Sequence, residues 1–397
     1  MSSSDSTTPV LLSAVRTPIG RFLGGLSTFS APQLGGMVIQ EAISRAGIAP
    51  ALVEEVFMGQ VVQGGSGQAP ARQALIKAGI PGTTSAVTVN EVCGSGLRAV
   101  MLAAQSVRTG DRACLVAGGQ ESMSSAPHYL FGMRQGVKAG NQLLIDGMIH
   151  DGLWCSFGGN HMGEYAEYTA EKAGVSRGDQ DAFAVQSHQK ALAAQESGRF
   201  TAEILPVTVP GKTPITVSAD ESPRKDTSAE TLAKLKPAFR KDGGTVTAGN
   251  APGLNDGASA LVVASLAFAK AHGLTPLARV TAYATGGGDP RDLFFAPIAA
   301  VRNLMAKAGT AIGDYDLIEA NEAFAVQALA DGRALGWDWD RVNVNGGAVA
   351  LGHPIGASGA RVLTTLVHAL RDRKKSTGLA TLCLGGGNAV ALSVEML

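Results

Sequence analysis

The sequence predicts an α/β protein built from two similar halves. The first observation is the length of 397 residues, which exceeds one ordinary core and suits two or three domains. The second is an internal repeat: residues 87–100 and 342–362 each contain an apolar strand ending in asparagine, a glycine-rich turn and Ser-Gly-x-Arg opening a helix. The third is the alternation of strands and helices in both halves, which favours largely parallel sheets packed about a pseudo-twofold axis.

The first half begins with a predicted strand at residues 11–18 (LLSAVRTP), followed by a second at 53–61 (VEEVFMGQV). After the first copy of the repeat, residues 113–119 (ACLVAGG) predict a buried strand that ends in glycines. A helix is expected between the first copy of the repeat and this strand, and it should end near Gly110. Apolar residues recur at helical spacing up to that glycine, at Leu97, Val100, Met101, Ala104 and Val107.

The second half follows the same order. Residues 278–285 (ARVTAYAT) correspond to the first strand, and residues 314–324 (DYDLIEANEAF) correspond to the second. After the second copy of the repeat, residues 379–387 (LATLCLGGG) predict the buried strand. Between them a helical face is formed by Val362, Leu363, Leu366 and Leu370.

A region of different character separates the halves. Residues 123–253 hold most of the histidines and an amphipathic helix at 178–197, with polar stretches rich in Pro and Lys after it. Loops carried on a rigid scaffold are where substrate recognition usually lies. We therefore divide the chain into an N-terminal half (1–122 plus 254–275), an inserted loop domain (123–253) and a C-terminal half (276–397).

Composition excludes several classes of protein. Formal net charge is zero and the pI is about 7.1, so the basic field needed for nucleic-acid binding is missing. Charged residues make up only 17%, which favours subunit-facing surface and predicts an oligomer. No apolar run is long enough to span a membrane, and residues 1–10 do not resemble a secretory signal. We expect a cytoplasmic protein.

The four cysteines form no CxxC pair and lie far apart, so we expect free thiols and neither a disulfide framework nor a zinc ribbon. His150, Cys155 and His161 also lack recognised metal-ligand spacing, and we expect no metal.

Cys93 admits two interpretations. A cysteine at a strand end is commonly a small buried apolar residue. At a helix N-terminus, exposed N–H groups and the helix dipole would instead favour the nucleophilic thiolate, and the flanking glycines would let a thioester reach it. The segment Gly94–Ala99 also matches the GxGxxA dinucleotide pattern, but the second copy does not repeat it, and a lone match has little weight.

The repeat brings further residues to the same place. If the copies pack about a twofold axis, His353 in GHPIGASG and Cys383 near the end of the last buried strand approach Cys93. His353 precedes a proline, which favours extended backbone, and a turn histidine bonded to backbone is the alternative. Asn321 is either a helix N-cap or a ligand for water or substrate at the sheet edge. His161 beside Met162 is either packed in a core or part of a pocket wall.

These motifs together resemble the thiolase family, and its short-chain branch in particular. The resemblance covers nearly the whole chain, through RTPIGRF (16–22), VCGSGLRAV (92–100), GGQESMS (118–124), HMG (161–163), DQDAFAVQS (179–187), TVTAGN (245–250), GLNDGA (253–258), EANEAFA (319–325), NVNGGAVALGHPIGASGAR (343–361) and CLGGG (383–387). The joint presence of CGSG, NEAFA, GHPxGxSG and CxGGG is highly specific.

The resemblance implies an acyltransferase in fatty acid metabolism that condenses two acetyl-CoA molecules to acetoacetyl-CoA and CoA, or runs the reverse thiolysis. Cys93 would be the nucleophile and His353 its base, and Cys383 would move the α-proton. One oxyanion hole would consist of His353 and a water held by Asn321, and the other of the backbone N–H groups of Cys93 and Gly385. Such donors stabilise the charge on an enolate oxygen, and the covalent intermediate implies ping-pong kinetics.

The family fold has two βαβαβαββ halves in five α-β-α-β-α layers, plus a loop domain that holds the coenzyme, commonly in a homotetramer built as a dimer of dimers. The resemblance implies no cofactor, since CoA thioesters are substrates. It places Arg224 at the adenine end and assigns further substrate contacts to Leu153, His161, Met162, Phe239, Ala248, Pro252 and Phe324.

Two departures bear on the acyl preference. Pro252 stands where short-chain relatives usually carry serine, and Leu293-Phe294-Phe295 replaces a segment that usually contains Met-Gly. A 3-ketoacyl-CoA thiolase of different chain length therefore stays an alternative. A ketoacyl synthase would pair its nucleophile with two histidines, whereas Cys383 stands at the second position here. A non-catalytic CoA-binding protein would not need all four residues Cys93, Asn321, His353 and Cys383.

Overall fold

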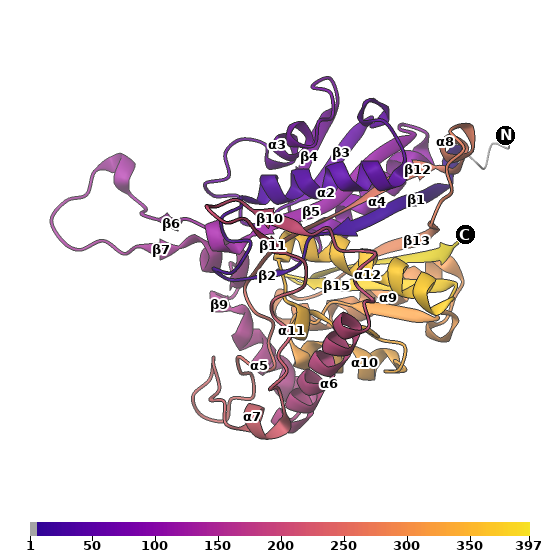
Figure 1. The fold of residues 1–397 in the computed structure, drawn as a ribbon. Helices are drawn as coiled ribbons and strands as arrows, with labels where there is room; N and C mark the ends of the chain where they lie inside the picture. The colour runs from indigo at the N-terminus through magenta and orange to yellow at the C-terminus, as the bar shows by residue number, and fades with distance from the viewer. Residues whose placement is uncertain (1–5) are drawn as a thin grey trace.

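The computed structural model describes residues 6–397, in which strands alternate with helices along both halves of the chain (Figure 1). Residues 1–5, which begin the predicted N-terminal half and the segment compared with a secretory signal, lie outside the described residues. The strands of the main sheet are β1 (Pro9–Arg16), β2 (Gly20–Arg21), β3 (Glu55–Gly59), β4 (Ser85–Val89), β5 (Cys114–Ser122), β12 (Asn255–Ser265), β13 (Ala278–Gly287), β14 (Leu317–Ala320), β15 (Thr377–Leu384) and β16 (Asn388–Met396).

The helices contain both long packing elements and single turns. They are α2 (Ala31–Ala46), α3 (Pro70–Lys77), α4 (Ser95–Thr109), α5 (Met162–Ala173), α6 (Arg177–Glu196), α7 (Ala229–Ala233), α8 (Leu266–Ala271), α9 (Ala296–Ala308), α10 (Ala325–Leu335), α11 (Ala348–Leu351) and α12 (Ile355–Arg373). Short 3-10 helices or π turns are η1 (Pro50–Leu52), η2 (Met123–Ser125), η3 (Met133–Gln135), η4 (Ile149–Leu153), η5 (Pro290–Phe295) and η6 (Ile312–Asp314). Measured over residues 6–397, none of the helices combines the length and apolar character needed to cross a bilayer.

The main sheet is mixed, which corrects the prediction of largely parallel sheets. Its order is β14-β15-β16-β13-β1-β12-β5-β3-β4, and β2 pairs with β12. Parallel pairing joins β3 to β4 and β5, and β14 to β15. The last strand of each half instead pairs antiparallel on both sides: β12 lies between β1 and β5, and β16 lies between β13 and β15. Both halves thus repeat one strand order, and they meet where β1 pairs with β13.

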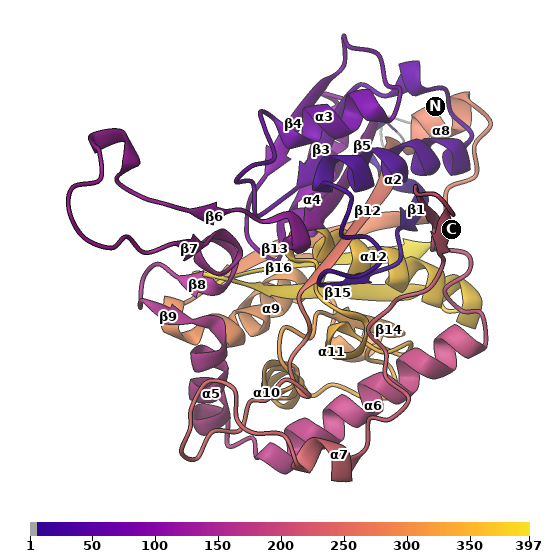
Figure 2. The same cartoon turned by 60° about the vertical axis from the view of Figure 1, so that its left-hand side comes forward.

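Helix α12 lies in the middle layer of the molecule. It packs against β5 and β12 of the N-terminal half, β14 and β15 of the C-terminal half, and α4. Its residues are buried without a break from Ile355 to Leu370, as expected of a helix enclosed on all sides. Helix α2 covers the outer face of the N-terminal half and α9 that of the C-terminal half, which gives five layers of helices and sheet (Figure 2).

The repeat is reproduced closely at its helices and less closely at its strands. Helix α4 ends at Thr109, and Gly110 caps it with a φ of 74°, as predicted. The strand expected to end at Asn345 does not form: Val342 makes only an isolated bridge to Ile318. The reason is Asn343, whose φ is 44° and whose side chain bonds the backbone N and O of Ala320 in place of a further strand.

Residues 123–253 hold α5, α6, α7 and three short hairpins, formed by β6 (His128–Tyr129) with β7 (Ile145–Asp146), β8 (Trp154–Cys155) with β9 (Asn160–His161), and β10 (Val207–Val209) with β11 (Ile215–Val217). The amphipathic helix predicted at 178–197 is confirmed as α6. Helices α5 and α6 pack against α10 and lie beside the C-terminal half (Figure 2). The β6–β7 hairpin projects away from the body of the molecule (Figure 1).

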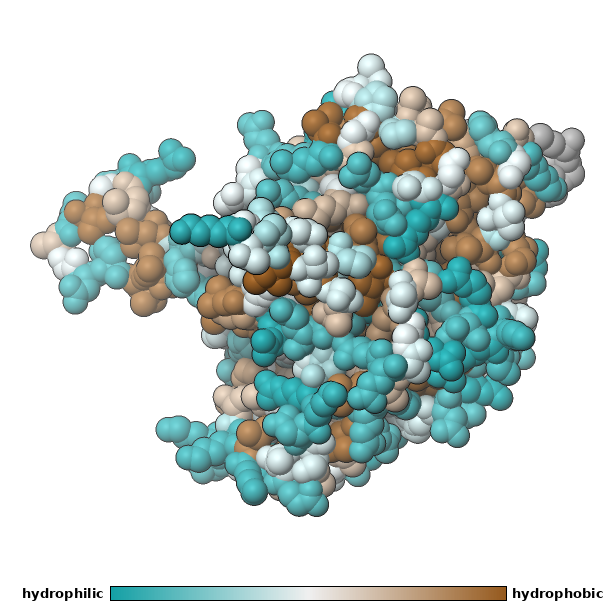
Figure 3. Space-filling view, viewed as in Figure 1, coloured by the Kyte–Doolittle hydropathy of each residue, from teal (hydrophilic) through white to brown (hydrophobic). Residues whose placement is uncertain are grey.

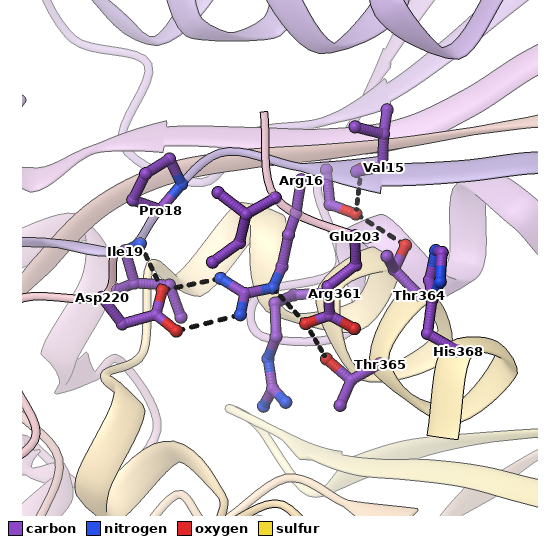
Figure 4. A network of polar contacts seen from close by, with 12 residues as sticks. Val15, Arg16, Pro18, Ile19, Glu203, Asp220, Arg361, Thr364, Thr365 and His368 are labelled. Carbon is purple, nitrogen blue, oxygen red and sulfur yellow. Dashed lines mark hydrogen bonds and ion pairs between the residues drawn. The ribbon is translucent and has the colours of Figure 1, made fainter. Parts of the chain in front are cut away.

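A buried ion-pair network fastens the middle region to the sheet (Figure 4). Arg16, at the end of β1, donates to Glu203 at 2.6 Å and to both oxygens of Asp220 at 2.6 and 2.9 Å. Arg361 on α12 pairs with Glu319 at 3.5 Å. The Arg16, Glu203 and Arg361 side chains are at most 2% exposed, so each charge depends on its partners for solvation.

Replacement of Arg16 by methionine is expected to destabilise the protein by about 3–5 kcal/mol, because Glu203 and Asp220 would stay buried without their partner. The free energy of unfolding in urea measures the loss. The exposed pair Arg279–Glu395 is a matched control, and Arg279→Met should cost less than about 1 kcal/mol. Equal losses in the two variants would contradict a structural role for the buried network.

Candidate active site

Cys93 lies in a tight turn between β4 and α4. The preceding residue, Val92, has a φ of 48°, a left-handed conformation that is a genuine outlier for a β-branched side chain. The turn is held by Ser95, whose N–H and hydroxyl both donate to the Val92 carbonyl, at 3.1 and 2.6 Å. The Ser95 hydroxyl also accepts from the N–H of Glu91 at 2.9 Å. The surrounding hydrogen bonds therefore impose the strained turn that carries the thiol.

The glycines beside Cys93 serve protein packing, which corrects the expectation that they make room for a thioester. A Cβ on Gly94 would lie 2.6 Å from the side chain of Leu384, the residue after Cys383. A Cβ on Gly96 would lie 2.6 Å from the backbone N of Ala360 on α12. Small residues here let α4 approach α12 and the end of β15, and this approach brings the two halves together around the thiol.

The Cys93 thiol is neutral in the free protein, contrary to the prediction that the helix start would favour thiolate. Burial raises the pKa of Cys93 to about 12, against the effect of the backbone N–H groups of Cys93 and Gly385, which lie against the sulfur. The charge of Glu121 raises this pKa further. Two backbone donors thus converge on the sulfur, but the nucleophile needs a base to become reactive.

His353 is placed by the segment between α11 and α12. Its N–H donates to the Asn255 side chain at 2.8 Å, and the preceding Gly352 has a φ of 108° and no room for a Cβ against the same asparagine. The His353 Nδ1 lies 2.6 Å from the Ser358 hydroxyl, which donates to the Pro354 carbonyl. Because that hydroxyl proton is used, Nδ1–H is the donor to Ser358. The Nε2 atom is then an unprotonated acceptor, and it has no partner among residues 6–397.

Burial keeps the His353 imidazole neutral. It lowers the pKa of His353 to about 3, and the charge of Arg361 acts in the same direction. His353 lies outside the helices on either side of it, in agreement with the expectation that the following proline keeps it out of a helix. A neutral histidine with a free Nε2 is suited to accept a proton from a thiol.

Cys383 is the last residue but one of β15 and is 1% exposed. Burial raises the pKa of its thiol well above the ordinary value, and charges on Cys93 and on Asp331 would raise it further. The next turn contains Gly385, followed by Gly386 and Gly387 with φ values of 83° and 89°. Cys383 is thus a second neutral thiol, able to act as a strong base once it has lost its proton.

Asn321 follows β14 directly and is completely buried. Its N–H donates to the Thr381 carbonyl at 3.0 Å, while both polar atoms of its side chain lack a partner within the described part of the chain. It is not a helix N-cap, since α10 begins at Ala325 and Phe324 occupies the cap. A buried amide without partners indicates a site for an internal water.

One apolar cavity of about 290 Å³ brings most of the predicted site together. Cys93, His353, Cys383 and Gly385 line it from the two halves, and Pro252 lines it from the end of the middle region. Asn321 is not part of the lining, although Ala323 and Phe324, two and three residues further along the chain, are. The other predicted residues that line the cavity are Leu153, His161, Met162, Phe239 and Phe324.

Aromatic rings form one wall of the cavity. His161 stacks on Phe239 with ring centroids 4.8 Å apart, and Phe324 stands edge-on to Phe239 and to Phe294 at 6.4 and 5.3 Å. His161 caps α5 by accepting from the Gly163 N–H, and burial lowers its pKa. The pocket-wall interpretation of His161 is therefore the one that the structure supports.

Two predicted contacts lie elsewhere. Arg224 and Ala248 are exposed and do not line the cavity. The backbone N–H of Arg224 donates to His188 at 3.1 Å. Across residues 6–397, no group of three His, Cys, Asp or Glu side chains is arranged to hold a metal ion.

Two further buried polar residues shape the site, and neither was predicted as a site residue. Glu121 on β5 accepts from the N–H groups of Val61, Val62 and Gly356, at 3.0, 3.2 and 2.8 Å, and thereby ties the start of α12 to the end of β3. Asn255 orients the backbone of His353. Both stand in otherwise buried strands, and a polar residue at such a position is the signal that would have identified them.

Residues 9–267 match the thiolase N-terminal domain, and residues 274–396 match the thiolase C-terminal domain. The chain belongs to the thiolase family. The resemblance inferred from the sequence motifs is thereby confirmed.

Similar thiolases align over nearly their whole length. The acetyl-CoA acetyltransferase of Pseudomonas aeruginosa is 55% identical over 387 residues, 97% of this chain and 98% of the relative. That of Chromobacterium violaceum is 54% identical over 387 residues, with the same coverage. The crystal structure of the Bacillus anthracis acetyl-CoA acetyltransferase superposes with a TM-score of 0.97 at 43% identity, and each chain is covered completely. The thiolase fold is therefore shared over the full chain.

Proposed function

We propose that this thiolase is an acetyl-CoA C-acetyltransferase, which condenses two acetyl-CoA molecules to acetoacetyl-CoA and CoA and runs the reverse thiolysis. The observation that carries the proposal is the convergence of two neutral thiols, Cys93 and Cys383, with the unprotonated nitrogen of His353 in one cavity. The names and near-complete alignment of the relatives support the same activity.

The first half-reaction acetylates Cys93. His353 Nε2 takes the thiol proton, and the sulfur attacks the carbonyl carbon of acetyl-CoA. The bond from that carbon to the CoA sulfur breaks, and Cys383 gives its proton to the departing CoA thiolate. Acetyl-Cys93, an imidazolium at His353 and a thiolate at Cys383 result, so no net charge is created in the buried site.

The second half-reaction forms the carbon–carbon bond. The Cys383 thiolate removes a proton from the methyl group of a second acetyl-CoA, and the enolate carbon attacks the acetyl group on Cys93. The bond from the acetyl carbon to the Cys93 sulfur then breaks, and His353 returns its proton to that sulfur. Acetoacetyl-CoA leaves, and all three groups regain their starting protonation states.

Oxyanions form in both half-reactions and require donors. The N–H groups of Cys93 and Gly385 lie against the Cys93 sulfur, so they are placed for the oxygen of an acyl group bound to it. We propose that His353 and a water on the unpartnered Asn321 amide serve the enolate oxygen. Each donor of this kind contributes about 3–4 kcal/mol to barrier reduction in well-studied enzymes.

Incubation with acetyl-CoA is expected to add one acetyl group to Cys93 and to block iodoacetamide there. Cys93 is partly exposed to the cavity, whereas Cys114, Cys155 and Cys383 are buried. Mass spectrometry of peptides after brief exposure measures both effects. Acetylation or protected labelling at Cys114 or Cys155, with Cys93 unmodified, would disprove the assignment of the nucleophile.

The acyl preference decides between this activity and thiolysis of longer 3-ketoacyl-CoAs. The aromatic wall, Leu293 and Pro252 enclose the cavity, which favours a short acyl group. We expect the specificity constant kcat/KM for thiolysis to fall by at least about tenfold from 3-ketobutyryl to 3-ketohexanoyl-CoA. A rise with chain length would favour the broader thiolase instead.

We also propose that the protein is a homotetramer. The support is the projecting β6–β7 hairpin, which exposes a cluster of apolar side chains seen as brown among teal in Figure 3; the most exposed are Leu143, Leu144 and Phe131, at 75%, 60% and 59%. Exposed apolar groups on a narrow projection typically lie in an interface. Light scattering during gel filtration should give four times the chain mass, and Leu143→Ser with Leu144→Ser should lower it.

A further inference from the structure

Hydrogen bonds hold the backbone of the turn that carries Asn321 at several positions. The N–H of Ala320 donates to the Asn343 side chain at 2.9 Å, and that of Asn321 donates to the Thr381 carbonyl at 3.0 Å. The Ala325 N–H donates to the Asn250 carbonyl at 3.0 Å. In contrast to these backbone donors, the Asn321 side-chain amide has no partner among the residues that the structure describes. The turn therefore presents one free amide in a defined position.

Two buried side chains on α10 complete this support. The Ala323 N–H donates to Gln327 Oε1 at 3.0 Å, and Gln327 Nε2 donates to Asp331 Oδ2 at 2.6 Å. Gln327 is 1% exposed and Asp331 is 0% exposed. These two hydrogen bonds link Asp331, through Gln327, to the backbone of Ala323. Ala323 lies two residues after Asn321 and lines the cavity.

Asp331 is an unusual residue for its surroundings. Its second oxygen, Oδ1, has no partner, and among residues 6–397 no lysine or arginine forms an ion pair with it. Burial raises its pKa well above the ordinary value. A buried carboxyl with one hydrogen bond is costly, and an apolar residue at this place would fold more easily. A role in orienting Gln327 accounts for its presence.

We propose that Gln327 and Asp331 are positioning residues that hold Ala323 and thereby set the place of the Asn321 amide in the enolate step. This inference rests on the oxyanion role proposed above for Asn321. Neither residue touches the substrate. Their effect passes through the turn at residues 321–325, so it falls on condensation and not on acetylation of Cys93.

The test compares Asp331→Leu with Asp331→Asn in the full-length protein. Leucine removes the acceptor for Gln327, whereas the asparagine carbonyl retains it. We expect Asp331→Leu to lower kcat for condensation by about 10- to 100-fold, since small displacements in an active site have effects of this size. The KM for acetyl-CoA and the Cys93 acetylation burst per folded molecule should change little, and Asp331→Asn should restore kcat to within about threefold of the parent.

Two reference variants separate the possible outcomes. Leu335→Ala on the same helix removes buried apolar contacts and leaves Gln327 and Asp331 unchanged. Its kcat per folded molecule should equal that of the parent. Asn321→Ala should lower kcat at least as much as Asp331→Leu. If Asn321→Ala reduces kcat and Asp331→Leu does not, the positioning proposal is overturned while the role of Asn321 stands.

Other results also overturn the proposal. If Asn321→Ala retains full condensation, the oxyanion role fails and the positioning role fails with it. If the acetylation burst and kcat of Asp331→Leu fall in equal proportion, the loss reflects a smaller number of folded molecules, and Asp331 acts on folding alone. Leu335→Ala, measured per total protein, gives the pattern expected of such a loss. If Asp331→Asn is as slow as Asp331→Leu, the hydrogen bond to Gln327 is not the cause.

Discussion

Replacement of Cys383 by alanine leaves Cys93 able to accept an acetyl group but lowers condensation by about 10³-fold or more. General acid–base groups of this kind contribute about 10²- to 10⁴-fold. The described residues that line the cavity include no carboxylate, and the other thiol there, Cys93, carries the acetyl group and cannot remove the α-proton. Acetylation persists because CoA is a good leaving group and His353 can return the proton to it. Mass spectrometry measures the acetyl-Cys93 formed, and a coupled assay measures condensation.

Cys114→Ala is the matched control for this variant. Cys114 is fully buried at the start of β5, within the core of the N-terminal half and away from the cavity, so its loss should leave both half-reactions intact per folded molecule. Condensation by Cys383→Ala at the parent rate would show that the α-proton is removed by another group.

Replacement of His353 by asparagine is expected to slow acetylation itself by at least about 10³-fold. With a pKa of about 12, roughly 10⁻⁵ of Cys93 is thiolate at neutral pH, so the reaction depends on a base that takes the proton as the sulfur attacks. Asparagine retains a donor but has no basic nitrogen. Stopped-flow release of CoA in a single turnover measures the acetylation rate, and a rate equal to the parent's would refute the role of His353.

The same assignment predicts the pH dependence of acetylation. An ordinary histidine gains its proton near pH 6.5 and stops acting as a base below that value. Burial lowers the pKa of His353 to about 3, so its Nε2 stays unprotonated from pH 8 down to pH 5. Acetylation should therefore show no loss centred near pH 6.5 in single-turnover measurements. A loss of tenfold or more with that midpoint would place His353 in a more hydrated environment.

The sequence predicts the duplicated fold because its signals are local. Helical spacing before Gly110 and the polar face of residues 178–197 locate α4 and α6, and the repeated Ser-Gly-x-Arg locates the two central helices. The sheet directions were harder to predict, because whether β12 and β16 insert antiparallel depends on packing between distant strands. Side chains alternate between the two faces of a sheet in parallel and antiparallel strands alike, so this pattern does not reveal the direction of a strand.

The candidate site, like the fold, was predicted from the sequence only in part. Residue types and motifs identified Cys93, His353 and Cys383, which line one cavity as predicted. The protonation state of Cys93 was predicted wrongly, since the helix position was visible in the sequence and the burial was not. The support residues Asn255 and Asp331 form contacts that only the folded chain defines.

The position of α12 between the two halves has a consequence for synthesis on the ribosome. The helix supplies buried contacts to β5 and β12, yet it lies in the last tenth or so of the chain to emerge. A nascent N-terminal half therefore exposes the part of its inner sheet face that α4 does not cover, until α12 has been translated. Such intermediates are prone to aggregate, and a truncation before Ile355 should yield insoluble protein that chaperones retain.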